Sequence, residues 1–169
     1  MVILISGTTH TGKTNLSQRL MEKYKIPYLS VDNLKMGLIR SGKTSLTVYD
    51  DAQLTLYLWS IVKEIIKTVI ENKQNIIIEG CYIPFDWQKD FDNNYLFAIK
   101  HYCLVMTAEY IETHLNDILQ FENVIEKRVL TEIKKEQLIE ENKNNLLLCQ
   151  KYDLEYILID KNYQINIQL

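Results

Sequence analysis

The chain has 169 residues, the size of one domain, and 47% of them are apolar, which excludes a chain that is mainly disordered. Its 19 basic and 22 acidic residues give a net charge of −3, which argues against a nucleic-acid partner. No apolar run approaches the ~20 residues that cross a bilayer, so we expect no membrane partner.

Apolar runs and helical repeats alternate along the sequence. Short runs rich in β-branched residues predict buried strands, and apolar residues spaced by three or four positions predict helices. In chain order we predict a strand at 2–5, a helix at 15–24, a strand at 25–31, helices at 32–40 and 50–72, strands at 75–80 and 97–106, helices at 107–117 and 125–150, and a strand at 154–159. This alternation predicts one α/β domain, 1–169, with a five-stranded, mainly parallel sheet covered on both faces.

Residues 7–14 read GTTHTGKT and match the phosphate-loop pattern G-x-x-x-x-G-K-[ST]. Gly7 and Gly12 let the backbone curl so that its N–H groups point at phosphates. Lys13 reaches the β- and γ-phosphates, and the Thr14 hydroxyl coordinates magnesium. His10 either contacts a phosphate oxygen or faces solvent. The pattern predicts that ATP and Mg²⁺ bind at Gly7, Thr8, Thr9, His10, Thr11, Gly12, Lys13 and Thr14.

The same pattern occurs a second time at 37–44, as GLIRSGKT. The first copy follows an apolar strand and precedes an amphipathic helix, which is the context that phosphate binding requires. The second copy follows polar residues, and no helix-length apolar face follows it before Asp50. We therefore predict that the first copy binds phosphate and that the second is a coincidence.

With this loop and this order of elements, most of the chain resembles the small P-loop kinases. These include nucleoside and nucleotide kinases, shikimate- and gluconate-type kinases and 2-phosphoglycerate-kinase-like proteins. The resemblance implies a three-layer α/β/α P-loop NTPase fold with a small helical lid. It maps the carboxylate that meets the phosphoryl acceptor onto Asp32, and the acidic residue beneath the acceptor onto Glu79.

The resemblance also places a lid around 117–130, and in the family a lid arginine closes on the transferring phosphate. Arg128 is the candidate for that role, although it could instead belong to a solvated helix face. Asn162 follows the fifth predicted strand, where related kinases hold the nucleotide base.

Polar residues at three strand ends support a site independently of the resemblance. Gly7, Asp32 and Glu79 follow or end predicted strands, and ligands bind at the carboxyl ends of parallel strands. Asp32 could accept a proton from an attacking hydroxyl, or it could cap a helix. Glu79 could serve the magnesium ion. Arg40 and Tyr82 are further candidates for acceptor binding, and Tyr82 could instead be a core residue.

We expect an ATP- and magnesium-dependent kinase that transfers the γ-phosphoryl group to a small hydroxyl- or phosphate-bearing acceptor. Lys13, Asp32 and Arg128 are the expected catalytic residues. The chain contains only three arginines, which argues against a nucleoside monophosphate acceptor. A non-catalytic nucleotide-binding regulatory module and a nucleoside monophosphate kinase-like enzyme are the alternatives. A GTPase would need an N/T-K-x-D motif after a late strand, which is missing, and the net charge argues against an RNA kinase.

The number and spacing of the cysteines indicate the cellular compartment. Cys81, Cys103 and Cys149 are odd in number and lack metal-ligand spacing, so we expect free thiols in a reducing cytoplasm. The sequence is compatible with a monomer or a homodimer.

Overall fold

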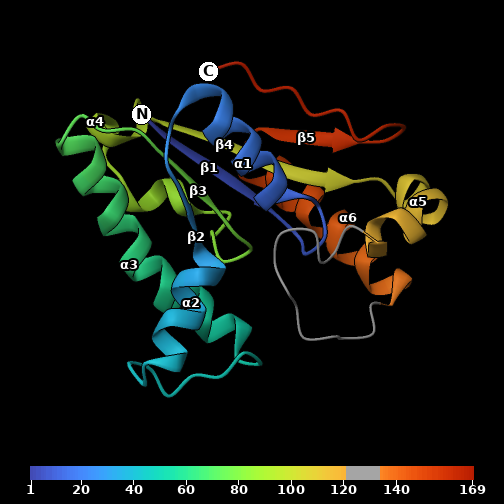
Figure 1. The fold of residues 1–169 in the computed structure, drawn as a ribbon, viewed down its shortest axis with the longest axis horizontal. Coiled ribbons are helices and arrows are strands. Elements are labelled where there is room, and N and C mark those ends of the chain that lie inside the picture. Colours follow the sequence, from blue (N-terminus) through green and yellow to red (C-terminus); the bar gives the residue numbers. More distant parts are fainter. Residues whose placement is uncertain (121–133) are drawn as a thin grey trace.

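The computed structural model describes residues 1–120 and 134–169. The strands of the described part are β1 (Val2–Gly7), β2 (Tyr28–Ser30), β3 (Ile76–Glu79), β4 (Ile99–Met106) and β5 (Tyr156–Ile159). They form one sheet in the order β2-β3-β1-β4-β5, and every neighbouring pair is parallel (Figure 1). The predicted five-stranded parallel sheet is confirmed.

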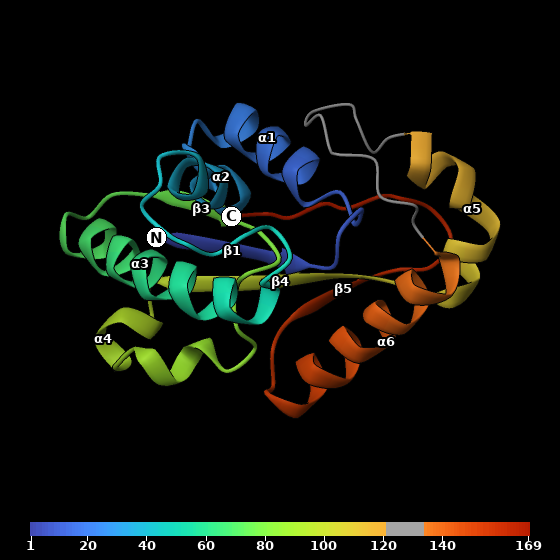
Figure 2. The ribbon, with the colours of Figure 1, turned by 90° about the horizontal axis from the view of Figure 1, so that it is seen from below.

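Helices cover both faces of this sheet. They are α1 (Lys13–Tyr24), α2 (Val31–Arg40), α3 (Asp51–Glu71), α4 (Asn93–Leu96), α5 (Ala108–Gln120) and α6 (Lys135–Lys151), with a 3-10 helix, η1 (Trp87–Asp90). Figure 2 shows α1 on one side of the sheet and α3 and α6 on the other. The predicted three-layer α/β/α arrangement is therefore confirmed.

The apolar run of β1 is explained by burial on both faces of the sheet. Val2 and Leu4 pack in a core cluster with the apolar face of α3, whereas Ile3 and Ile5 pack in a second cluster with α1 and α5. Successive side chains of a strand point to opposite faces, so a central strand between two helical layers needs apolar residues at consecutive positions.

Local chemistry sets two of the helix boundaries. The Thr107 hydroxyl accepts a hydrogen bond from the Tyr110 N–H at 3.1 Å, so Thr107 caps α5 as predicted. At the end of α1, Lys25 adopts a left-handed φ of 56° and its N–H donates to the Met21 carbonyl at 2.8 Å. This left-handed residue terminates the helix.

The second strand is shorter than predicted. The apolar residues near 25–31 include Val31, which already belongs to α2, and the strand is limited to Tyr28–Ser30. Pro27 has no N–H to donate to the sheet, although its carbonyl accepts from the Ile77 N–H at 2.9 Å. The apolar run is thus shared between a strand and the first turn of a helix.

Other differences lie further along the chain. The four-residue helices η1 and α4 escape prediction because they are too short for a helical repeat. The predicted helix at 125–150 is observed over Lys135–Lys151, and residues 125–133 lie outside the described residues. The same holds for residues 121–130 of the predicted lid. No helix in the described part of the chain is long and apolar enough to cross a bilayer.

An added methyl group should have opposite effects on stability at two of the glycines. At Gly80 a Cβ would lie 2.8 Å from the Val31 Cβ, whereas at the exposed Gly37, inside α2, nothing lies within 4 Å. We expect Gly80→Ala to lower the free energy of unfolding by about 1–3 kcal/mol through overpacking. Gly37→Ala should raise it by about 0.5–1 kcal/mol because alanine favours helix. Urea denaturation of the two variants measures both effects, and equal destabilisation would contradict the packing argument.

Candidate functional site

The loop between β1 and α1 has a backbone that only particular residues tolerate. Gly7, His10 and Gly12 have positive φ values of 145°, 67° and 79°. A Cβ at Gly7 would lie 2.7 Å from the Leu104 carbonyl oxygen of β4 and 2.8 Å from the Thr11 Oγ1. Glycine is therefore needed at position 7 both for its conformation and for the close approach to β4.

The first turn of α1 leaves backbone donors at the end of this loop. Gly12 is the N-cap residue and supplies no capping side chain, and the first turn of α1 contains no acidic residue. The first N–H groups of a helix have no partners within it, and they carry the positive end of the helix dipole. Such a terminus next to a curled loop is suited to bind phosphate.

Lys13 is folded back against the loop. Its side chain is buried, and its Nζ donates to the Thr8 carbonyl oxygen at 2.6 Å. The Thr11 hydroxyl donates to the same carbonyl at 2.9 Å. The ammonium group is thus held within the loop, where it could exchange a neutral carbonyl for phosphate oxygens of higher charge.

Thr14 and Glu79 meet at the edge of the sheet. The Thr14 hydroxyl donates to Glu79 Oε1 at 3.3 Å, and Glu79 is buried at the end of β3, opposite Ile5 of β1 and Ser30 of β2. The residues predicted to serve magnesium therefore lie together. A hydroxyl and a carboxylate fit this ion, which takes oxygen ligands and usually completes its shell with phosphates and water.

No group of three or more His, Cys, Asp or Glu side chains that could hold a metal ion by itself occurs in residues 1–120 and 134–169. A metal ion at the Thr14–Glu79 pair would therefore depend on oxygen atoms from a bound phosphate or from water.

Asp32 belongs to a hydrogen-bonded chain that joins α2 to α3. Asp32 Oδ1 accepts from Lys35 Nζ at 2.6 Å, and the same Nζ donates to the Tyr82 hydroxyl at 3.0 Å. The Tyr82 hydroxyl in turn donates to Asp51 Oδ1 at 2.9 Å. Asp32 lies in the first turn of α2, and Ser30 is the N-cap residue, so the capping alternative for Asp32 is wrong.

The protonation of this chain follows from burial and charge. Burial alone would lower the pKa of Lys35, but the nearby charge of Asp32 and hydrogen bonds to Asp32 and Tyr82 raise it to about 12. Burial raises the pKa of Tyr82 to about 12, although Lys35 opposes this rise. At neutral pH the lysine is therefore charged and the tyrosine keeps its proton. Sequence reasoning missed Lys35, although its i, i+3 spacing from Asp32 is typical of a helical ion pair.

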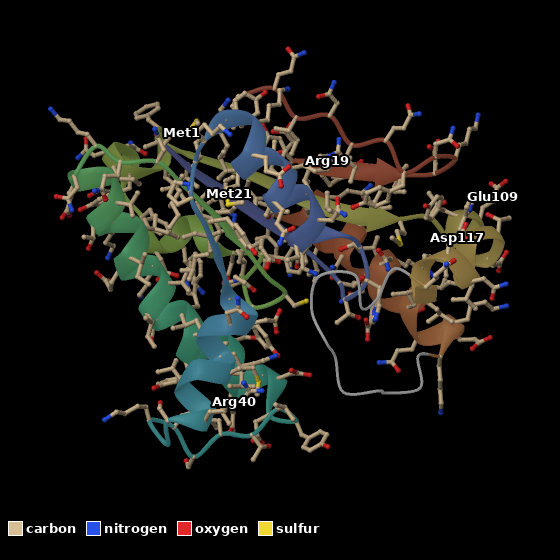
Figure 3. All side chains as sticks on the ribbon, viewed as in Figure 1. Met1, Arg19, Met21, Arg40, Glu109 and Asp117 are labelled. Atoms are coloured by element: carbon tan, nitrogen blue, oxygen red, sulfur yellow. The ribbon has the colours of Figure 1, made fainter. Side chains whose placement is uncertain are left out.

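The remaining predicted residues are less closely tied to the loop. Arg40 is exposed at the last position of α2, and Figure 3 places it at the end of that helix far from the phosphate loop. Asn162 is exposed after β5, and its carbonyl accepts from the Gln164 N–H at 2.8 Å. Arg128 lies outside the described residues, so its role stays a prediction.

The second G-x-x-x-x-G-K-[ST] copy has a different structure. Its first four residues, 37–40, are the last residues of α2, and a turn follows. Gly42 has a left-handed φ of 67°, and a Cβ there would meet nothing within 4 Å. This copy has no strand directly before it and no helix directly after it, as predicted from the sequence.

A buried asparagine that is distant in sequence forms a hydrogen bond to the phosphate loop. Asn142 of α6 is 1% exposed, and its Nδ2 donates to the Thr8 hydroxyl at 3.0 Å and to the Leu138 carbonyl at 2.8 Å. Its Oδ1 accepts from the Met106 N–H at 2.8 Å. The amide thus joins α6, the end of β4 and the loop, and no sequence pattern indicates this contact.

A histidine lies beneath the start of the loop. His101 of β4 is buried, and its Nε2 lies 2.9 Å from the Ser6 Oγ, one residue before Gly7. Its ring also lies 5.9 Å from that of Trp87. Burial lowers the pKa of His101 to about 4, so the ring is neutral in the folded protein near pH 7.

Comparison with solved structures identifies the fold. A candidate kinase from Chloroflexus aurantiacus is 18% identical with a TM-score of 0.59, covering 98% of this chain and 91% of its own. Deoxyadenosine kinase from M. mycoides is 17% identical with a TM-score of 0.52, covering 95% and 90%. Shikimate kinase from Bacteroides thetaiotaomicron is 16% identical with a TM-score of 0.50, covering 95% and 85%. The chain therefore has a P-loop kinase-like fold.

Comparisons of sequence identify no further related protein. No known family model matches the chain, and no curated protein matches it either.

Removing the Asn142 amide should destabilise the protein. Asn142→Ala leaves the Met106 N–H and the Thr8 hydroxyl without this partner, so we expect unfolding to be easier by about 1–3 kcal/mol. Asn144→Ala, on an exposed position of the same helix, is the matched control and should change stability by less than about 0.5 kcal/mol. Chemical denaturation compares the two variants, and similar midpoints would contradict the role of the buried amide.

Because His101 is buried in its neutral form, we expect the protein to lose stability in mild acid. Its folded pKa of about 4 lies below the ordinary value of 6.5, so the unfolded chain binds a proton that the folded protein does not. This contribution is fully present above pH 6.5 and falls by about 3 kcal/mol as the pH drops towards 4. Denaturation of the wild type and His101→Gln at several pH values measures it. Parallel curves for the two proteins between pH 6.5 and 4 would refute this prediction.

Proposed function

We propose that this protein is an ATP- and magnesium-dependent kinase that phosphorylates a small hydroxyl- or phosphate-bearing acceptor. The observation that carries the proposal is the loop at 7–14, which connects a buried strand to a helix without a side-chain cap. Its backbone curls through positive φ values at Gly7 and Gly12. Buried Lys13 lies within this loop, and Thr14 contacts Glu79 beside it. Together they provide donors for phosphate and oxygen ligands for a metal ion.

In this proposal the loop and Lys13 bind the triphosphate. Backbone N–H groups of the loop and of the first turn of α1 would donate to the phosphate oxygens. Lys13 would leave the Thr8 carbonyl and contact the β- and γ-phosphates. A bound magnesium ion would neutralise charge on the phosphates, and Thr14 and Glu79 would hold it. His10 would contact a phosphate oxygen, and Asn162 would lie beside the nucleotide base.

Asp32 would orient the acceptor hydroxyl. The hydroxyl oxygen attacks the γ-phosphorus, the bond from that phosphorus to the β–γ bridging oxygen breaks, and the hydroxyl proton passes to Asp32. The products are ADP and the phosphorylated acceptor. Lys35 keeps the Asp32 carboxylate oriented through their 2.6 Å contact, and Tyr82 fixes Lys35 in turn. Arg128 would close on the transferring phosphate, and Arg40 would bind an acidic acceptor group.

A non-catalytic nucleotide-binding module is the second candidate, and the Asp32–Lys35 ion pair favours it. The Asp32 Oδ1 already accepts a hydrogen bond from the Lys35 ammonium group at 2.6 Å, so an acceptor hydroxyl would have to share or displace this contact. In that case nucleotide would bind, but no acceptor would be phosphorylated.

Nucleotide binding is tested with two lysines in equivalent sequence patterns. We expect Lys13→Ala to weaken Mg-ATP binding by about 10- to 100-fold, because a charge-assisted contact to phosphate is lost. Lys43→Ala, in the second copy of the pattern, should leave the Kd within about twofold of the wild type. Isothermal titration calorimetry measures both, and equal losses would overturn the assignment of the first loop.

Phosphoryl transfer is tested separately from binding. Asp32→Asn should keep Mg-ATP binding within about threefold but lower transfer by about 100-fold or more, the usual contribution of a positioned base. Transfer from γ-labelled ATP is measured against fractionated pools of small metabolites. If the wild type binds ATP and transfers label to none of the pools, the non-catalytic module becomes the better hypothesis.

A further inference from the structure

The segment that follows β5 returns across α1. Residues 160–169 run from the end of β5 alongside α1 (Figure 1). Ile165 and Ile167 are buried in the same cluster as Leu16 and Leu20 of that helix. The Tyr24 hydroxyl donates to the Ile167 carbonyl at 3.2 Å. The segment is thus packed on the helix that begins at the phosphate loop.

Tyr163 extends this packing to the loop itself. Its hydroxyl donates to the Thr11 carbonyl oxygen at 2.9 Å. A Cβ at Gly12 would lie 1.9 Å from the Tyr163 hydroxyl oxygen and 2.6 Å from the ring carbon that bears it. The end of the tyrosine ring therefore rests on Gly12, and only glycine leaves room for it. Position 12 is constrained by this contact as well as by its φ of 79°.

The hydrogen bond from Tyr163 fixes the orientation of one peptide group. A trans peptide is planar, and its C=O and N–H point in opposite directions. No cis peptide bond occurs in residues 1–120 and 134–169. Because the Thr11 carbonyl points to Tyr163, the Gly12 N–H of the same peptide points to the opposite side. This N–H belongs to the run of loop donors proposed above to bind phosphate.

The phenol is suited to a constant donor role. Burial raises the pKa of Tyr163, and Tyr110 adds to the rise whereas Arg19 opposes it. The hydroxyl therefore keeps its proton throughout the range in which the protein is folded near neutral pH.

We propose that Tyr163 is a positioning residue of the nucleotide site, which acts on the phosphates through the Thr11–Gly12 peptide. This inference rests on the proposed nucleotide binding at 7–14, but it does not require phosphoryl transfer. Without the tyrosine hydroxyl the peptide can rotate, and nucleotide binding must then fix its orientation at a cost in affinity.

The chain offers a matched control in Tyr24. Its hydroxyl also bonds the returning segment, at Ile167, but it lies at the far end of α1 from the loop. Tyr163→Phe removes the hydroxyl that joins this segment to Thr11 of the loop, whereas Tyr24→Phe removes one that joins the segment to the far end of α1, and both variants retain the ring. A difference between them therefore reports the contact with the loop and not a general loosening of residues 160–169.

The first experiment measures Mg-ATP binding by calorimetry. Tyr163→Phe should weaken the Kd about three- to tenfold, the effect of one neutral hydrogen bond, while Tyr24→Phe stays within twofold of the wild type. The inference is overturned if Tyr163→Phe also stays within twofold, or if Tyr24→Phe weakens binding equally.

The second experiment needs no nucleotide. Amide hydrogen exchange of the peptide that covers residues 7–14 should be faster in Tyr163→Phe than in the wild type, and unchanged in Tyr24→Phe. If the wild type binds no nucleotide, the proposed function fails, yet this exchange difference would still support the loop contact. Unchanged exchange in Tyr163→Phe would overturn the contact whatever the protein binds.

Discussion

Gly7 leaves β1 where a side chain would strike the Leu104 carbonyl of the neighbouring strand, 2.7 Å away. This close approach ties the start of the phosphate loop to the centre of the sheet. The loop then passes through two further positive-φ residues before α1 begins at Lys13. Every group of the candidate site is placed relative to this curl: Lys13 within it, Thr14 just beyond it, and Glu79 on the adjoining strand. The fold positions chemistry here mainly by holding backbone in a conformation that few residues adopt.

The two halves of the site are built differently. The phosphate half of the proposed site consists largely of backbone groups, which would bind phosphate whatever molecule carries it. The proposed acceptor half consists of side chains, in which Asp32, Lys35, Tyr82 and Asp51 are joined by hydrogen bonds of 2.6–3.0 Å. Their hydrogen bonds run to one another and not to residues 7–14. In the proposed kinase, acceptor specificity would therefore depend on α2 and α3, whereas nucleotide binding would depend on β1 and α1.

The sequence was sufficient to predict what is encoded locally or by strand ends. The loop at 7–14 follows from its motif and from the strand and helix around it. The contact between Thr14 and Glu79 follows from the rule that the ends of parallel strands meet at one edge. In contrast, Asn142 and Tyr163 contact loop residues that are 134 and 152 positions away in the chain. No periodicity or motif signals such contacts, because they depend on how α6 and the segment after β5 pack.

These two long-range contacts also affect when the loop acquires its structure during synthesis of the chain. A ribosome synthesises the loop well before residues 142 and 163, yet these later residues hold Thr8 and Thr11. Contacts between residues so far apart in sequence form late, since a long loop must close first. A nascent chain could thus contain the complete phosphate motif before that motif has its final shape. Competence to bind nucleotide would then report that the whole domain has folded.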